Sequence, residues 1–103
     1  MLVTMDMFGN GGVNPIVDSG TESVSVPNTT TISTKSVTFN HELPSIPKIY
    51  TNNDQTASTS GIDAKWCASC AKDVTTTGFT LNVHQGSTNA TKTVVVDWIA
   101  VIE

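Results

Sequence analysis

The final twelve residues constrain the fold of this chain more than any other segment. In "KTVVVDWIAVIE", residues 92–103, β-branched and aromatic side chains dominate, a composition that favours an extended strand. Alternation along such a strand places Val94, Val96, Trp98 and Ala100 on one face, and Val95, Asp97, Ile99 and Val101 on the other. A strand of an antiparallel sandwich normally has one polar face. This strand has only Asp97 to interrupt its second apolar face, so it needs a cover on both sides.

Five further segments also favour strands. They are "ESVSVP", "TKSVTFNHEL", "PSIPKIYTNND" and the stretches at about 64–74 and 78–85. The apolar positions of the first three are Val24, Val26, Val37, Phe39, Ile46, Ile49 and Tyr50. Pro44 and Pro47 restrict the third segment to an edge strand or an irregular one. No segment keeps the apolar spacing of a helix through three turns, so we predict an all-β antiparallel sandwich of about six strands.

The composition narrows the class of partner. Hydrophobic residues make up 38% of the 103 residues and charged residues only 14%, so Ser, Thr and Asn supply most of the polar surface, as strands prefer. The formal net charge of −4 argues against binding nucleic acid or an anionic membrane surface. No run approaches the roughly 18 apolar residues that would indicate insertion into a membrane.

The first twenty residues differ from the rest. "MLVTMDMFGNGGVNPIVDSG" follows neither strand nor helix spacing, and we expect residues 1–20 to form an extended segment whose Met5, Met7 and Phe8 contact a neighbouring subunit or other proteins of an assembly. Residues 21–103 are expected to form the sandwich. The beginning of the chain shows no signal peptide, so a location outside the cell would be reached by lysis or as part of a particle.

Cys67 and Cys70 have the spacing of a thioredoxin dithiol. A working pair of that kind lies at a helix N-terminus, and "AKDVTTTGF" after Cys70 is poor helix material. In an extended strand the two residues lie roughly 10 Å apart and point to opposite faces, so they are not expected to form a disulfide. We interpret them as reduced structural thiols, with a dithiol redox protein as the remote alternative.

The sequence contains no recognised catalytic or metal-binding pattern. His41 and His84 have no spacing that completes a metal site with the two cysteines, and both are interpreted as surface polar residues. No Ser, His and acid fall in a local catalytic motif, and no lysine of a phosphate loop follows "GNGG" at residues 9–12. We therefore predict no enzyme, no metal and no cofactor.

Three motifs in order resemble the H-type lectins, the family of the snail agglutinins. They are the turn Thr77-Gly78-Phe79, the terminal Trp98-Ile99-Ala100-Val101 and the upstream "SVTFNHELPSIPKIY", and the resemblance covers about residues 21–103. Gly78 is expected to take a positive φ in the turn, after which Phe79 returns to the core. The resemblance implies a homotrimer or a dimer of trimers that binds carbohydrate, typically N-acetylgalactosamine, in a shallow site between protomers without calcium.

The resemblance also assigns site positions by alignment. The family's acid falls at Asn28, its arginine at Trp66 and its Trp-His pair near Gly86 and Ser87, so none of the family's own site residues is retained. Asn28 and Ser87 remain able to hydrogen-bond a sugar hydroxyl, and an outward Trp66 is able to stack on a sugar face. The alternation pattern alone favours an inward Trp66, whereas the resemblance favours Cys67, Ser69 and Ala71 inside and Trp66 outside.

These features favour an attachment module that recognises a cell-surface glycan, carried by a trimeric fibre or tail component of a phage or virus. Packing of the second face of residues 92–101 against other copies is the expected source of the trimer, and folding of residues 1–20 over that face is the alternative. A trimerisation or capping domain that binds no ligand is the alternative function.

Overall fold

The computed structural model describes residues 15–27, 31–54, 56–58, 67–86 and 91–103 and confirms the all-β prediction. Its six strands are β1 (Ile16–Val26), β2 (Ser33–Thr38), β3 (Lys48–Asp54), β4 (Ala68–Lys72), β5 (Gly78–His84) and β6 (Lys92–Val101). Strand β1 begins inside the segment expected as an N-terminal lead-in, because Ile16–Gly20 continues the pairing of β1 with β6. No helix long and apolar enough to cross a membrane occurs in the described residues.

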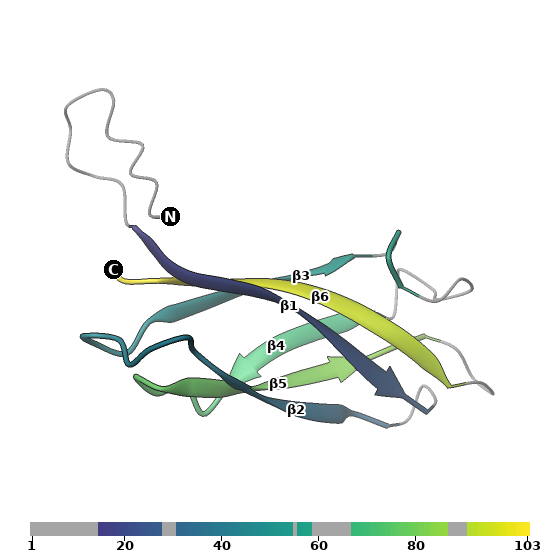
Figure 1. Ribbon diagram of the computed structural model, residues 1–103. Helices are drawn as coiled ribbons and strands as arrows, with labels where there is room; N and C mark the ends of the chain where they lie inside the picture. Colours follow the sequence, from purple (N-terminus) through teal and green to yellow (C-terminus); the bar gives the residue numbers. More distant parts are fainter. Residues whose placement is uncertain (1–14, 28–30, 55, 59–66, 87–90) are drawn as a thin grey trace.

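The strands form two three-stranded sheets that lie face to face (Figure 1). The order is β1-β6-β3 in one sheet and β2-β5-β4 in the other, and every pairing is antiparallel. The centres are thus β6 and β5, which carry more buried residues than any other strand. Strand β3 lies at a sheet edge, as Pro44 and Pro47 before it predict.

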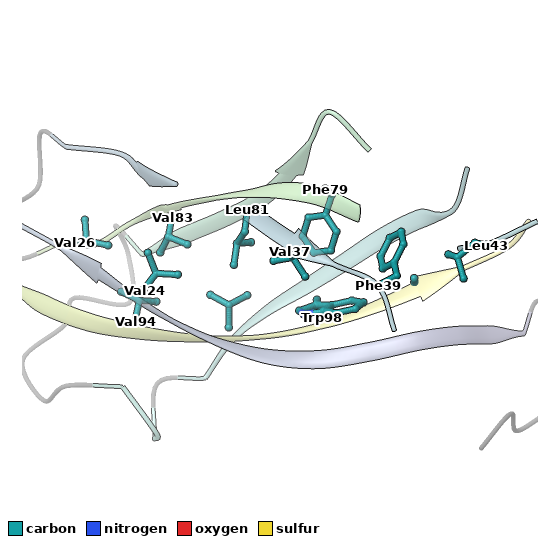
Figure 2. Close-up of a cluster of buried hydrophobic side chains, with 12 residues drawn as sticks. Val24, Val26, Val37, Phe39, Leu43, Phe79, Leu81, Val83, Val94 and Trp98 are labelled. Carbon is teal, nitrogen blue, oxygen red and sulfur yellow. The ribbon is translucent and has the colours of Figure 1, made fainter. Parts of the chain in front are cut away.

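The core lies between the two sheets (Figure 2) and follows the predicted alternation. Its buried members are Val24, Val26, Val37, Phe39, Leu43, Phe79, Leu81, Val83, Val94, Val96, Trp98 and Ala100. Of the apolar positions in the proline-led segment, only Ile49 packs on this core. Tyr50 follows Ile49 and therefore points to the opposite face, where it is exposed, and Ile46 precedes the strand and is exposed as well.

Three aromatic rings form the centre of the core. The rings of Phe79 and Trp98 meet edge to face with centroids 5.2 Å apart, and Phe39 lies 5.8 Å from Trp98. The indole N–H of Trp98 donates to Oε2 of Glu22 over 3.1 Å, and Lys35 pairs with Oε1 of the same carboxylate over 3.1 Å. Glu22 therefore satisfies the one polar atom of the ring and links β1 to β2 across the sandwich.

Gly20 allows the indole to lie flat against β1. Gly20 pairs with Trp98 in the register, and a Cβ atom at Gly20 would come within 2.8–2.9 Å of three ring atoms. No side chain fits there without displacing the ring.

The turn before β5 departs from the prediction in one respect. Gly78 does not have a positive φ; instead, a Cβ atom there would collide with the carbonyl oxygen of Val37 on β2. Close approach of the backbone is thus the reason for glycine, and the positive φ of this hairpin belongs to Asp73, at 53°. The Thr75 hydroxyl accepts from the amides of Thr77 and Gly78 and so closes the turn.

The two cysteines lie on opposite faces, as their spacing in an extended chain predicts. Cys67 packs against the core with Ala71, whereas Cys70 is exposed on the outer face of β4, and neither forms a disulfide. Half-buried Ser69 lies between them in the alternation. The family resemblance implies the same orientation, with Cys67, Ser69 and Ala71 facing inward. Trp66 itself lies outside the described residues.

We expect Gly20→Ala to destabilise the fold by about 1–3 kcal/mol, because the added methyl group overpacks the Trp98 ring. Urea unfolding followed by tryptophan fluorescence measures the change. In an unobstructed strand the same substitution would stabilise by roughly 0.5–1 kcal/mol, so the sign of the change is diagnostic. Ser25→Ala, at an exposed position of β1, is the control and should leave the unfolding midpoint unchanged. Unaltered stability in Gly20→Ala would contradict the close packing described above.

Candidate functional site

The predicted site positions attach to strands that meet at one end of the sandwich. In Figure 1, β1, β3 and β5 point towards the right-hand end, where β2, β4 and β6 begin. The register agrees, because Val26 pairs with Lys92, Ser33 with Val83 and Ala68 with His84. We refer to this end as the loop end. Asn28, Trp66 and Ser87 lie outside the described residues, close in sequence to these strand ends, and Gly86 is half-buried just beyond β5.

Gln85 ties the two sheets together at the loop end. It is the only buried polar side chain among the described residues, with 0% of its surface exposed, and its Nε2 donates to the carbonyl oxygen of Val26 over 3.2 Å. The donor comes directly after β5 and the acceptor is the last residue of β1. This bond therefore fixes how far apart the sheets lie where Gly86 begins the next loop.

A second set of hydrogen bonds holds the end of β3 against β6. Oδ1 of Asp54 accepts from the amide of Ala57 over 3.0 Å, and the Ser58 hydroxyl donates to the Asp54 carbonyl over 2.6 Å. The same hydroxyl oxygen accepts from the amide of Val95 over 2.8 Å. The Asp54–Ser58 turn is thus joined to the central strand of its sheet, and the loop end has a fixed frame on both sides.

A shallow recess lies on the outer face of the β2-β5-β4 sheet, next to the loop end. It encloses about 180 Å³ and is lined by Ile32, Ala68, Ser69, Cys70, Asn82, Val83 and His84. Cys70 pairs with Asn82 and Ala68 with His84, so these side chains are neighbours on one face. Ile32 lies at one side of the recess and is 62% exposed. Among the residues that the structure describes, no carboxylate, ammonium or guanidinium group lines the recess.

The outer face of the β1-β6-β3 sheet is the second surface of interest. Val95, Asp97 and Ile99 of β6 are half-buried there, and Tyr50, opposite Ile99 on β3, is 46% exposed. Oδ1 of Asp97 accepts from the Thr21 hydroxyl over 2.7 Å, which satisfies part of this carboxylate. A hollow of about 190 Å³ lies between Tyr50, Asn52, Asp97 and Ile99. This face is therefore mixed, with apolar side chains at its centre and Ser and Thr along β1.

Tyr50 and Glu103 form one further polar contact. The Tyr50 hydroxyl donates to Oε2 of Glu103 over 2.8 Å, and this hydrogen bond, with smaller contributions from desolvation and the carboxylate charge, raises the pKa of Tyr50. Among the described residues, no three His, Cys, Asp or Glu side chains gather where they would hold a metal ion. A larger hollow of about 400 Å³ near Ile46 and Val74 lies at the opposite end from the predicted site.

Comparison with known proteins identifies the fold. A sequence model of the H-type lectin domain matches residues 34–101, more than half of the chain. The chain belongs to the H-type lectin domain family. The matched region runs from within β2 to the end of β6 and contains Gln85, the aromatic cluster and the residues that line the recess, apart from Ile32. The H-type lectin domain is a binding module, so the family places this chain among binding proteins.

A solved structure agrees with the fold. The tailspike of Pseudomonas phage phi297 superposes with a TM-score of 0.59 at 15% sequence identity. The match covers 82% of this chain but 15% of the tailspike chain, so this H-type lectin domain corresponds in fold to one part of a much longer protein. None of the curated proteins compared with the chain matches it significantly.

Sequence reasoning did not find the residues that frame the loop end. Gln85 follows a strand and precedes a glycine, a position typical of a solvent-exposed loop residue, and only the approach of Val26 from the other sheet reveals its role. Ser58 lies in the run "NNDQTASTSG", where nothing in the sequence distinguishes it from the neighbouring Ser and Thr residues. The outward parity of Cys70 was predicted, but the recess also needs Ile32, which is 36 positions from Ala68.

We expect Gln85→Met to destabilise the domain by about 1–3 kcal/mol. The substitution keeps the length of the side chain but removes its donor, so the Val26 carbonyl loses this partner in a buried position. Gln85→Glu is the informative companion, because burial raises the pKa of the new carboxyl group. Its stability should therefore be greatest at low pH and fall as the pH rises through that pKa. Unfolding midpoints at several pH values measure both effects. A Gln85→Met variant as stable as the parent would show that the hydrogen bond from Gln85 to Val26 does not stabilise the domain.

Proposed function

We propose that this H-type lectin domain binds carbohydrate and serves as an attachment module in a trimeric fibre or tail component. The family match over residues 34–101 is the observation that carries the proposal. The fold likeness to one part of a phage tailspike supports the proposed setting, on the virion or outside the cell. In this setting the domain performs no catalysis, and it requires no metal or other cofactor.

The glycan is proposed to bind at the loop end. Asn28, Trp66, Gly86 and Ser87 follow or precede strands whose ends meet there, and Gln85 holds the two sheets at a fixed separation beside Gly86. Asn28 and Ser87 offer groups that hydrogen-bond sugar hydroxyls, and Trp66 offers a ring that stacks on the apolar face of a pyranose. Because the side chains at these positions differ from those of the family, the preferred sugar is proposed to differ as well.

The trimer is proposed to form through the outer face of the β1-β6-β3 sheet. Half-buried Val95 and Ile99 and exposed Tyr50 supply an apolar centre, and tyrosine is enriched at the energetic centre of protein interfaces. Asp97 already accepts a hydrogen bond from Thr21, which lowers the cost of burying its carboxylate. Residues 1–20 are proposed to add contacts to neighbouring subunits or to other fibre proteins, although Ile16–Gly20 also begins β1 of the sandwich. Residues 21–103 are proposed to supply the rest of the lectin domain.

A glycan array tests the carbohydrate proposal. We expect the wild-type protein to bind at least one glycan, and Trp66→Ala to weaken that binding by about thirtyfold, the effect of truncating a tryptophan worth roughly 2 kcal/mol. Ile46→Ala is the matched control, because Ile46 is exposed at the opposite end of the sandwich and should not alter binding. A trimer that binds no glycan would favour the trimerisation or capping domain in place of the lectin.

Light scattering after size-exclusion chromatography tests the assembly. We expect a trimer or hexamer whose mass does not depend on reductant, since Cys67 and Cys70 form no disulfide. Ile99→Glu, which places a charge at the centre of the proposed interface, should give a monomer. Ser36→Glu adds the same charge on the outer face of the other sheet and should leave the mass unchanged. A monomeric wild-type protein would overturn the proposed trimer.

A further inference from the structure

The recess on the outer face of the β2-β5-β4 sheet is the feature with the clearest ligand chemistry. It lies on the face opposite to the proposed trimer interface, so it remains open in that assembly. Three of its lining residues lie where strands meet the loop end: Ile32 precedes β2, Ala68 begins β4 and His84 ends β5. A ligand held at the loop end therefore reaches the recess by extending along the sheet.

The described lining favours an uncharged ligand with an apolar group. Ile32, Ala68 and the thiol of Cys70 contribute apolar surface, and none of the lining side chains among the described residues is an acid, lysine or arginine. At about 180 Å³ the recess is smaller than the roughly 300–1,000 Å³ of a pocket that encloses a drug-sized molecule. It therefore suits one sugar residue or its substituent.

Asn82 adds a polar requirement at the same place. Its Oδ1 atom is buried and accepts no hydrogen bond within the described residues. Asn82 lies between Thr34 and Cys70 in the register, so no charged group of a paired strand stands directly beside it. Buried acceptors in native proteins are almost always paired, so an unpaired one beside an open recess favours a ligand that donates. Rotation of the terminal amide turns this oxygen towards such a donor.

We propose that this recess is a second sugar subsite, which takes a pyranose bearing a methyl-terminated substituent such as an acetamido or 6-deoxy group. The methyl group fills the space between Ile32, Ala68 and Cys70, and an N–H or O–H of the sugar donates to Asn82. This inference rests on the proposed carbohydrate binding, and it places the subsite apart from Asn28, Trp66, Gly86 and Ser87. The ligand is accordingly an oligosaccharide of at least two residues.

Matched sugars test the chemistry. Amide chemical shifts of the ¹⁵N-labelled protein are followed during titration with N-acetyl-D-glucosamine against D-glucose, and with D-fucose against D-galactose. Each pair differs only in the methyl-bearing group. We expect the first member of each pair to shift the amides of Ile32, Ala68 and His84, and to bind at least tenfold more tightly than the second. Equal effects of the two members would overturn the inference.

The exposed thiol provides an independent test with the glycan that the array identifies. Modification of Cys70 with N-ethylmaleimide fills the recess and should weaken glycan binding at least tenfold relative to the untreated protein, whereas the same treatment should leave the affinity of Cys70→Ala equal to that of untreated Cys70→Ala. Ser36→Cys in the Cys70→Ala background places the same adduct on the same outer face but outside the recess, so treatment with the reagent should not change the affinity of this variant. Glycan binding that survives modification of Cys70 overturns the subsite and leaves the lectin proposal intact. If no glycan binds the unmodified protein, both are overturned.

Discussion

The position of the Trp98 indole is the constraint on which most of the fold depends. The ring is held from three directions: edge contact with Phe79, the Nε1–H bond to Glu22 and the bare backbone of Gly20 beneath it. These contacts connect β6 with β5 and with β1. Because Glu22 also pairs with Lys35 of β2, the single indole sets the distance between the two sheets along one open side of the sandwich. A smaller ring would deprive Glu22 of the indole N–H and would remove the need for glycine at position 20.

The other open side is joined in a different way. There the Ser69 hydroxyl of β4 donates to the Thr51 hydroxyl oxygen of β3 over 2.9 Å, and the Thr51 hydroxyl donates to the carbonyl oxygen of Ser69 over 3.3 Å. One side of the sandwich thus uses a charged pair with long side chains, and the other uses two short hydroxyl groups. The sheets consequently approach closely at β3 and β4, where Ala71 and Cys67 are small enough to pack on the core.

Alternation along the strands made most of this fold predictable. The inward positions of β6, the burial of Val37 and Phe39 and the edge position of β3 all follow from local pattern, since each depends on residues within a few positions of one another. The reason for Gly78 was predicted incorrectly, because it depends on a carbonyl group of another strand. The packing of the outer face of β6 against other copies is a proposal. It is based on the mixed surface of that face, where Ile99 and Tyr50 meet Ser and Thr side chains.

The candidate site was also predictable only in part, because some of its residues are brought together by contacts between distant segments. Alignment to the family named Asn28, Trp66, Gly86 and Ser87 from sequence alone, and the topology then showed that the flanking strands end together. The recess beside them required the register, since Ile32, Ala68 and His84 come from three segments that no sequence pattern links. Long-range pairing of this kind is set by the whole sheet and by the turns that join its strands, so it is weakly encoded in any one segment.

The two hydrogen bonds at the loop end affect how the sequence of such a domain can change. Gln85 donates to the carbonyl of Val26 and Ser58 accepts from the amide of Val95, so both bonds use backbone groups as partners. Backbone groups are present whatever the side chains of the neighbouring residues. Substitutions at residues 28–30, 59–66 and 87–90 therefore leave the donors and acceptors of both bonds in place, which makes this framework suited to changes of sequence at the proposed site.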